Sequence, residues 1–344
     1  MLVVRAITAD DLEALLDMAA QVGSGMTTLK PDRKMLGDRV SVAVQSFAET
    51  IAPEKRDYMF VMEDTSNGRM AGICAIKGAV GLDEPFYNYR IGTLVHSSRE
   101  LNVFTRMETL YLSNDLTGST ELCSLFLHPD YRVGNNGKWL SKSRFLFIAQ
   151  FPHLFTEKLI AEMRGYQEED GRSPFYEGLG RHFFKMDFNH VDNLTAIGKK
   201  SFIAELMPRQ PLYVDYLPDD ARKVIGMVHT STAPARRLLE QEGMHYEGYV
   251  DIFDAGPVLQ ARVSELRAMR DSTVSVAEQA ELSAGDRPTL VSNTTLHDFR
   301  MIVASAGPVQ GKVALTASEL ALLHCQAGDQ VRTLSLNVRK NAHV

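Results

Sequence analysis

The sequence predicts an α/β (α+β) fold in which tandem mixed sheets are flanked by helices and followed by a small β unit at the C-terminus. Three observations predict this fold. Short apolar runs with strand character alternate with segments of helical period. Part of this pattern occurs twice, and the composition changes after residue 270. A chain of 344 residues also has room for two or three units, at roughly 150 residues each.

The first half of the chain predicts strands and helices that alternate. Residues 3–7 are a short apolar run, and residues 12–19 carry apolar side chains three or four positions apart, which favours a strand followed by an amphipathic helix. The Asn67-Gly68 pair lies between two further apolar runs and is typical of a tight hairpin turn. The other expected elements are strands at 58–63, 70–76, 109–112, 120–127 and 158–163, and a helix at 138–150.

A pattern of strand, proline-started helix, glycine and aromatic strand occurs twice. The two copies are residues 158–165 with 173–183, and residues 223–230 with 233–246. The repetition suggests a duplication in which Arg164 and His229 occupy equivalent places at the ends of two strands. Because α/β sheets usually bind ligands at the carboxyl ends of their strands, both residues are candidates for a functional site.

The last part of the chain predicts a linker and then a small β unit. Residues 271–288 are polar and have no clear period, which favours a linker. Short alternating strands are expected at 312–320 and 327–336.

The composition argues against several classes of function. A net charge of −6 and a pI near 6.0 provide no basic field for nucleic acid. No stretch approaches the roughly 18 to 20 apolar residues of a membrane span, and the start of the chain does not have the pattern of a signal peptide. Cys74, Cys123 and Cys325 each lie in an apolar segment and match neither a disulfide set nor a metal site. We therefore expect core thiols, a cytoplasmic location and no metal.

A loop rich in glycine and asparagine joins an expected strand to an expected helix. Gly134 and Gly137 tolerate positive φ and let backbone N–H groups turn inward, while the helix N-terminus and Arg132 add positive charge. This arrangement suits a pyrophosphate. The strand beside the loop, which holds Leu125 and Leu127, would offer backbone groups to the pantetheine arm of coenzyme A. A glycine-bearing connection with no ligand is the alternative.

This loop resembles the acyl-CoA loop of the GCN5-related N-acetyltransferase superfamily, whose pattern is Arg/Gln-x-x-Gly-x-Gly/Ala. In register with Arg132, the first glycine position holds Asn135 and the second holds Gly137, with a further glycine at Gly134. The two proline-started helices resemble that superfamily's later helix and strand, twice over. The resemblance implies a first N-acyltransferase-like domain with the acyl-CoA loop at 1–200, a second, partial one at 201–270, and the β-rich unit at 285–344.

A closer resemblance, to the arginine N-succinyltransferase family, covers nearly the whole chain. It is carried by residues 84–90, 93–96, 110–118, 121–127, 160–165, 202–208, 226–229 and 249–257. It implies an acyltransferase that moves the succinyl group of succinyl-CoA to the α-amine of L-arginine, giving N2-succinyl-L-arginine and CoA, as the first step of arginine catabolism by the succinyltransferase pathway. It further implies that Leu125 contacts succinyl-CoA, that His229 is the proton donor, and that the chain forms a homodimer or a heterodimer with a related subunit.

The chemistry of this reaction agrees with these residue types. An amine that attacks a thioester loses a proton and the departing thiol gains one, so a side chain that titrates near neutrality helps at either step. We therefore favour His229 as the catalytic group over His96 and His128. A backbone N–H between Leu125 and Leu127 would stabilise the oxyanion of the tetrahedral intermediate.

The two substrates also require charged partners. The distal carboxylate of the succinyl group needs an arginine, a lysine or several N–H donors, and Arg90 and Arg164 are the candidates. The guanidinium of arginine needs a facing acid, and Glu162 and Asp115 are the candidates. Glu162 and Arg164 are two residues apart on one strand face, so mutual pairing is the structural alternative.

Two alternative functions remain open at this point. The family includes subunits that act on both arginine and ornithine, so the chain could belong to an arginine/ornithine succinyltransferase. The other alternative is a catalytically silent acyl-CoA-binding partner of an active subunit. In the enzymatic case, direct transfer in a ternary complex needs no metal, no covalent cysteine intermediate and no tightly bound cofactor beyond the acyl donor.

Overall fold

The protein is described by a computed structural model that covers residues 1–22, 26–196, 201–281, 287–305 and 307–337. These ranges contain the strands β1 (Leu2–Ala6), β2 (Asp57–Asp64), β3 (Arg69–Lys77), β4 (Asn88–Ser98), β5 (Val103–Ser113), β6 (Thr120–Leu127), β7 (Lys158–Glu162), β8 (Leu212–Tyr213), β9 (His245–Asp251), β10 (Pro257–Arg262), β11 (Thr273–Gln279), β12 (Thr289–Ser292), β13 (Arg300–Ala304), β14 (Lys312–Leu315) and β15 (Gln330–Ser335). They contain the helices α1 (Leu12–Ala19), α2 (Arg33–Phe47), α3 (Asn136–Gln150), α4 (Arg181–Phe184), α5 (Phe188–Ala196), α6 (Ser201–Leu206), α7 (Asp219–Lys223), α8 (Ala233–Gln241), α9 (Arg267–Asp271) and α10 (Ala317–Leu322).

All the strands in these ranges belong to one continuous mixed sheet. Its order is β14-β11-β15-β12-β13-β1-β2-β3-β6-β7-β10-β9-β4-β5-β8. β6 with β7 and β11 with β14 run parallel, while the neighbours on either side of β1 run antiparallel to it. The mixed α/β class that the sequence predicts is confirmed, but the strands expected in two tandem units are hydrogen-bonded along a single sheet.

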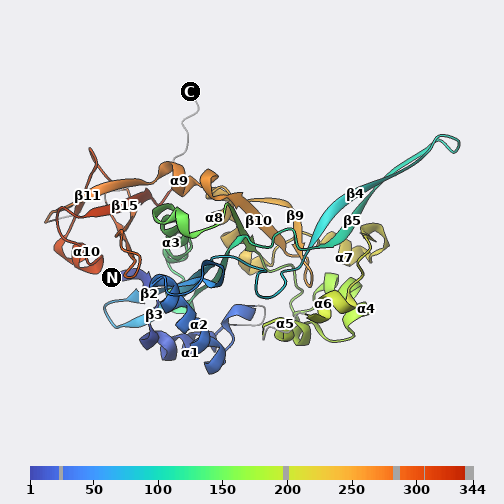
Figure 1. Ribbon diagram of the computed structural model, residues 1–344, viewed down its shortest axis with the longest axis horizontal. Coiled ribbons are helices and arrows are strands. Elements are labelled where there is room, and N and C mark those ends of the chain that lie inside the picture. The colour runs from blue at the N-terminus through green and yellow to red at the C-terminus, as the bar shows by residue number, and fades with distance from the viewer. Residues whose placement is uncertain (23–25, 197–200, 282–286, 306, 338–344) are drawn as a thin grey trace.

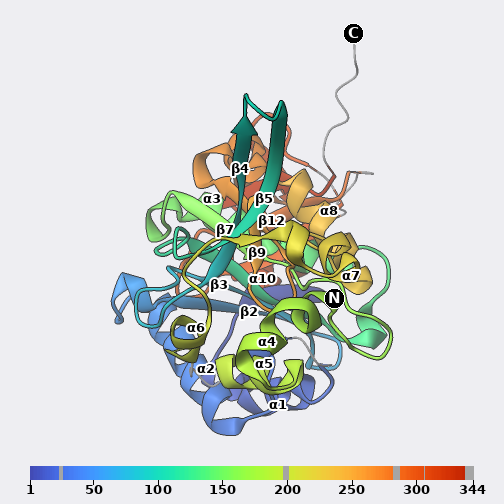
Figure 2. The ribbon, with the colours of Figure 1, turned by 90° about the vertical axis from the view of Figure 1, so that its right-hand side faces the viewer.

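Helices cover both faces of the sheet (Figure 1). Successive residues of β2 alternate between these faces, as a pleated strand requires. Phe60 packs with Phe147 of α3 on one face, and Val61 packs with Leu36 of α2 on the other. Figure 2 shows α4, α5 and α6 at the end of the molecule that faces the viewer, and Figure 1 shows that these helices lie apart from α1 and α2. The cluster around Phe184 forms their core.

Most of the local elements expected in the first half of the chain are confirmed. β1, α1, the β2–β3 hairpin, β6, α3 and β7 lie within a few residues of their predicted positions. In the hairpin, Gly68 has a φ of +69°, a left-handed conformation that glycine adopts without steric cost. The side chain of Asn67 accepts a hydrogen bond from the Arg69 N–H at 2.9 Å, which holds the turn.

The predicted strand at 223–230 is wrong. α7 ends at Lys223, the chain then turns at Gly226 with a φ of +74°, and within the described residues only Val228 of this segment forms a β-bridge, to Gly165. The apolar run is too short and too interrupted by the turn to extend as a strand. The following α8 and β9 are present, as expected.

The first copy of the predicted repeat also differs from its expected structure. Residues 181–184, expected as part of an aromatic strand, form α4, and a π-helical turn at Tyr176–Gly180 precedes it. Arg164 and His229 are consequently not equivalent positions at the ends of two strands. They are neighbours across the bridge between Gly165 and Val228.

The polar segment after residue 270 is not a linker throughout. Residues 273–279 form β11, which pairs with both β14 and β15. This strand buries the small residues Ser275 and Ala277 and exposes two valines, so its apolar pattern does not reveal which face is buried.

One segment of the C-terminal unit is a helix where a strand was expected. Residues 317–322 form α10, which begins with a capping box between Thr316 and Glu319. The predicted domain boundaries at residues 200 and 285 lie outside the described residues, so these boundaries stay predictions.

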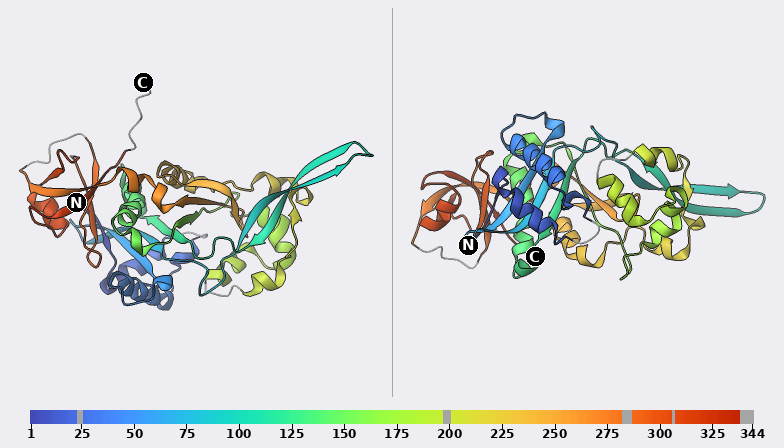
Figure 3. Two further views of the ribbon diagram at one scale, coloured as in Figure 1. Left: turned by 45° about the horizontal axis from the view of Figure 1, so that its top comes forward. Right: turned by 90° about the horizontal axis from the view of Figure 1, so that it is seen from below.

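β4 and β5 form a two-stranded ribbon that projects from the rest of the molecule (Figures 1 and 3). The pairing is in register from Asn88 opposite Ser113 to Ser98 opposite Val103. The sequence predicted residues 109–112 but not the remainder, because most of the ribbon has no buried face to impose an alternating pattern. Phe104, for example, is 69% exposed.

Candidate active site

β6 and β7 are parallel neighbours that separate soon after they begin. Thr120 and Glu121 pair with β7, and no later β6 residue pairs with it in the described part of the chain. A β-bulge bends β6 at this point, where Ser124 has a φ of +53° and the register against β3 shifts. Leu125 and Leu127 follow the bulge and are half-buried. The β7-facing backbone of β6 is therefore open along the segment that the sequence singled out.

Side chains from the α1–α2 layer hold this bulge in place. Arg39 Nη1 donates to Ser124 Oγ at 2.8 Å, and Ser124 Oγ donates to Thr28 Oγ1 at 2.9 Å. The Arg39 guanidinium is itself fixed by Asp57, whose Oδ2 accepts from Nε at 2.7 Å. A serine in the left-handed backbone conformation costs of order 1 to 3 kcal/mol of conformational free energy. The bulge persists because these hydrogen bonds stabilise it.

The N-terminus of α3 presents backbone donors beside this opening. Within the described residues the N–H groups of Gly134, Asn135, Gly137 and Lys138 have no hydrogen-bond acceptor. Gly134 has a φ of +56°, which turns its amide out of the helical direction. Free amides at the start of a 15-residue helix, together with the helix dipole, give this end of α3 a local environment that favours negative charge.

Arg132 lies between this helix and the end of β6. Its Nε donates to the Leu127 carbonyl at 3.0 Å, and its guanidinium carbon lies 5.5 Å from the centre of the Phe126 ring. The side chain is exposed, so its charge faces solvent. At Gly137, by contrast, a Cβ would meet only Leu127 at 3.7 Å, so this position does not require glycine on steric grounds.

The imidazole of His229 is held through its Nδ1 atom. Nδ1 lies 2.7 Å from Ser231 Oγ and accepts from the Ser231 N–H at 3.2 Å. His229 also begins the short 3-10 helix Thr230–Thr232, in which Thr232 Oγ1 donates to the His229 carbonyl at 2.9 Å. Because Nδ1 already contacts Ser231, Nε2 is the nitrogen that is available to exchange a proton with a ligand.

Arg164 lies directly after β7 and is fixed by backbone contacts on both sides. The His229 N–H donates to the Arg164 carbonyl at 2.8 Å, and the Gly165 N–H donates to Asp254 Oδ2 at 2.7 Å. The crossing is so close that a Cβ on Gly165 would lie 2.6 Å from Asp254 Oδ1, and a Cβ on Gly256 would overlap the Met163 carbonyl. The two glycines allow the backbones to approach.

Burial and charge shift the pKa values of the groups around this crossing. Burial lowers the pKa of His229 below its ordinary 6.5, and the Arg164 guanidinium lowers it further. Burial also lowers the pKa of Arg164, against the opposing effect of Asp254. Burial raises the pKa of Asp192 in α5 to about 6, and that of Asp254 well above its usual range. Such perturbed groups cluster at functional sites.

Glu162 and Arg164 do not pair with each other in the described part of the chain, and each forms a hydrogen bond with a different residue. Asn88 Nδ2 donates to Glu162 Oε1 at 2.7 Å, and Arg164 Nη2 donates to Gln167 Oε1. Asn88 and Gln167 are buried, at 1% and 8% exposure. Neither residue was expected at the site. Asn88 lies in the 84–90 segment of the family resemblance but has no role assigned by it, Gln167 lies outside those segments, and both contacts depend on strands that are distant in sequence.

Several other predicted residues lie elsewhere. Arg90 Nη1 lies 3.6 Å from Asp115 Oδ2, which also accepts from the Tyr249 hydroxyl at 3.0 Å, so the two candidates of opposite charge pair with each other. His96 lies on the ribbon, 3.1 Å from the Tyr213 hydroxyl. His128 Nδ1 accepts from the Asp130 N–H at 3.2 Å and caps a short 3-10 turn.

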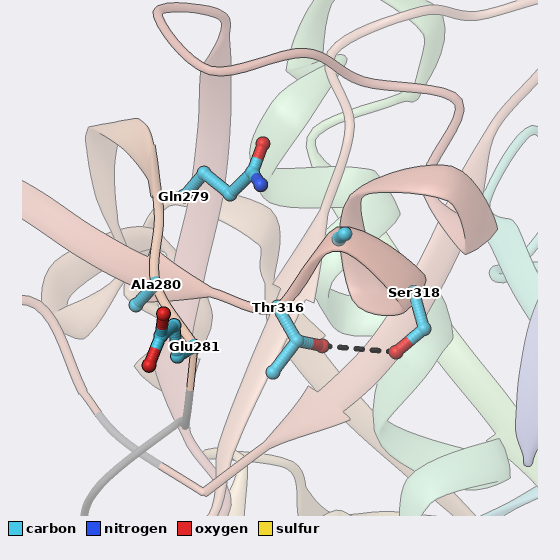
Figure 4. A pocket seen from close by; sticks show the side chains of 6 residues that line it. Gln279, Ala280, Glu281, Thr316 and Ser318 are labelled. Carbon is cyan, nitrogen blue, oxygen red and sulfur yellow. Dashed lines mark hydrogen bonds between the residues drawn. The ribbon is translucent and has the colours of Figure 1, made fainter.

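The C-terminal unit has a shallow hollow of its own (Figure 4). It is lined by Gln279, Ala280, Glu281, Thr316, Ala317 and Ser318, and the Thr316 and Ser318 hydroxyls are 3.0 Å apart. β11 and α10 form its walls, and β11 is far from β7 and β10 in the order of the sheet.

None of the described helices is long and apolar enough to cross a membrane.

Comparison with known proteins covers both parts of the chain. Residues 2–268 match the family model described as arginine N-succinyltransferase beta subunit, and residues 270–335 match the model of its C-terminal domain. The curated arginine N-succinyltransferases of Shigella sonnei and Escherichia coli O139:H28 are each 47% identical over 337 residues, which is 98% of this chain and 98% of each relative. The solved structure of arginine/ornithine succinyltransferase subunit AI from Pseudomonas aeruginosa is 35% identical with a TM-score of 0.90, covering 98% of this chain and 99% of that one.

Proposed function

This chain belongs to the arginine N-succinyltransferase family and transfers a succinyl group to arginine; from this premise we propose that succinyl-CoA is the donor and that the transfer is direct. The products are then N2-succinyl-L-arginine and CoA. The observation that carries the proposal is the open edge of β6 beside the unpaired amides at the start of α3.

The donor would bind in two parts. The pyrophosphate of CoA would accept hydrogen bonds from the free amides between Gly134 and Lys138 and face the exposed charge of Arg132. The pantetheine arm would then lie along β6 and add its amides to the backbone at Leu125 and Leu127. A free N–H on this edge would stabilise the oxyanion that forms on the thioester carbonyl.

His229 would move the proton of the reaction. The α-amine of arginine attacks the thioester carbon, and Nε2 of the neutral imidazole accepts the proton that the nitrogen loses. This step uses the tautomer that carries its hydrogen on Nδ1, where the Ser231 hydroxyl accepts it in place of the contact with the Ser231 N–H. The imidazolium then returns the proton on Nε2 to the sulfur as the carbon–sulfur bond breaks, so CoA leaves as a thiol, and the Ser231 hydroxyl accepts from Nδ1–H in both charge states.

Charged residues near His229 would select the substrates. Arg164 is our candidate for a carboxylate, because its guanidinium lies close enough to lower the pKa of His229. Glu162 is our candidate for the guanidinium of arginine. Arg90 stays a weaker candidate for the succinyl carboxylate, because it is half-exposed and paired with Asp115.

The decisive experiment is the release of free thiol by the purified chain. Succinyl-CoA or acetyl-CoA is supplied with L-arginine, L-ornithine or no amine, in every combination. The proposal expects the fastest release with succinyl-CoA and arginine. If succinyl-CoA binds and no thiol is released with any amine, the chain is instead a silent partner subunit.

Ornithine is tested as a second acceptor in the same assay. The solved relative from Pseudomonas aeruginosa is described as an arginine/ornithine succinyltransferase subunit. Ornithine carries an ammonium group where arginine carries a planar guanidinium. Equal rates with the two amines would mean that the acid facing the substrate side chain recognises its positive charge and not the planar shape of the guanidinium.

We also propose an oligomer in the cytoplasm, either a homodimer or a heterodimer with a related subunit. The exposed apolar side chains of the β4–β5 ribbon, such as Leu101 and Phe104, support an interface there. The free thiols of Cys74, Cys123 and Cys325 suit a reducing compartment. Light scattering coupled to size exclusion tests the assembly, and a purely monomeric mass would contradict it.

A further inference from the structure

Two side chains just beyond β7 have hydrogen-bond donors without acceptors. Within the described residues, Nε of Arg164 and Nε2 of Gln167 are buried and have no partner. The two side chains are joined, since Arg164 Nη2 donates to Gln167 Oε1. An unsatisfied buried donor costs about 1 to 3 kcal/mol, so the ligand-free arrangement lacks something that these groups are built to bind.

Nearby acids do not remove this requirement. The two carboxylate oxygens of Asp254 accept the N–H groups of Gly165 and Gly256, at 2.7 Å and 2.9 Å. In the described part of the chain Arg164 forms no salt bridge, and its Nη1 makes no hydrogen bond. Arg164 is half-buried rather than enclosed, so a ligand can reach its guanidinium.

The donors define the chemical class of the missing group. A guanidinium edge beside an amide N–H offers planar donors with no acceptor of their own, which matches the two oxygens of a carboxylate. Both substrates of the proposed reaction carry one. Arginine has an α-carboxylate, and the succinyl group has a distal carboxylate two methylenes from the thioester carbon.

The position next to His229 distinguishes these two sources. The α-carboxylate shares its carbon atom with the amine that attacks, so its binding group must lie beside the residue that takes the amine's proton. The Arg164 carbonyl accepts the His229 N–H at 2.8 Å, which places the two residues side by side. The distal succinyl carboxylate would instead lie along the donor chain, away from the amine.

We propose that Arg164 and Gln167 bind the α-carboxylate of the amino-acid acceptor, an inference that rests on the proposed function. Arg164 contributes the charge, and Gln167 contributes its amide N–H after a small rotation of its side chain. The pair therefore selects amino acids over amines that lack the carboxylate.

The test compares L-arginine with L-argininamide, in which a neutral amide replaces the carboxylate. Gln167→Glu keeps the shape of the side chain and places a negative charge beside the substrate carboxylate. We expect it to lower kcat/KM for arginine about 10- to 100-fold, mainly through KM, and to change kcat/KM for argininamide little, which is the loss expected for a hydrogen bond to a charged group. Arg172→Gln, on the exposed turn nearby, is the matched control and should leave both values unchanged.

The other results separate the possible failures. If Gln167→Glu reduces the preference for succinyl-CoA over acetyl-CoA and leaves the arginine to argininamide ratio alone, the carboxylate belongs to the donor and our assignment is overturned. It is also overturned if neither ratio changes in a folded, active variant. Gln167→Leu, checked by circular dichroism, replaces Gln167→Glu if the charged variant does not fold. If the wild type releases no thiol with arginine, the proposed function fails, and calorimetric binding of arginine against argininamide tests the subsite by itself.

Discussion

The backbone N–H of His229 donates to the carbonyl oxygen of Arg164 at 2.8 Å. This bond connects the turn that carries the imidazole to the strand end that carries the guanidinium. Because β7 also pairs with β10 on its other side, the two functional groups are mounted on one sheet. Small displacements of a catalytic group can lower the rate by large factors. The hydrogen bond between the two backbones fixes the position of His229 relative to Arg164.

Replacing His229 by alanine should separate chemistry from binding. The variant loses one acid/base group, so kcat should fall about 10²- to 10⁴-fold. The residues that we propose for CoA binding lie on β6 and at the start of α3 and are untouched, so calorimetry should give nearly unchanged CoA affinity. An unchanged kcat would remove His229 from the mechanism.

Ser231→Ala should shift the pH profile as well as the rate. The protonated imidazole loses the hydroxyl that accepts from Nδ1–H, so the charged form is less stable and the pKa of His229 falls further. The acidic limb of kcat/KM should move to lower pH, and kcat should fall several-fold. Ser231→Thr keeps the hydroxyl and serves as the control. A lower rate with an unmoved limb would indicate only a structural role.

Arg164→Gln should raise the pKa of His229. Burial is the larger cause of the lowered pKa and is retained, while the repulsion from the guanidinium is lost. The pKa should therefore move towards 6.5 without reaching it, and NMR titration of the imidazole in the free enzyme measures this directly. A pKa that stays in place or falls would mean that the two charges do not interact.

Arg132→Ala should weaken CoA binding while leaving arginine binding intact. The lost interaction is an exposed charge with a phosphate, so we expect about a tenfold rise in the Kd of CoA at low salt, and less at high salt. Titration at two ionic strengths measures both effects. Equal affinity in the variant and the wild type would refute the placement of the pyrophosphate at α3.

Gly165→Ala should destabilise the fold and disrupt the site together. The new Cβ would lie 2.6 Å from Asp254 Oδ1, so the crossing of the two backbones must open, at a cost of about 1 to 3 kcal/mol in unfolding free energy. Gly37→Ala is the control, because that position lies in α2 and its Cβ would meet only Leu12 at 3.7 Å. The control should be neutral or stabilising by up to about 1 kcal/mol in denaturant melts.

The sequence predicts those parts of the fold whose signals are local. The Asn67-Gly68 turn and the helix after Gly137 are recognisable because a few neighbouring residues determine them. β11, β4 and most of β5 escaped prediction, because partners distant in sequence decide which of their residues are buried.

The same limit applies to the site. Arg132 and Gly134 are visible in a motif, and His229 and Leu125 through a family resemblance. No pattern assigns a role to Asn88, Gln167 or Ser231, and their contacts appear only once β4, β7 and the 226–232 turn are brought together. The adjacency of His229 to Arg164 was hidden for this reason, since the repeat suggested two separate strand ends.

The position of β1 has a consequence for how the chain is made. β1 precedes the other described strands in the chain, yet it lies between β2 and β13, with Val4 opposite Met301 and Arg5 opposite Arg300. One of its edges must stay unpaired until residues 300–304 have been synthesised. An open strand edge invites pairing with other chains, so a nascent or truncated protein that stops near residue 270 should be prone to aggregate. The C-terminal unit therefore protects the rest of the sheet from aggregation, because its strand β13 pairs with the otherwise open edge of β1.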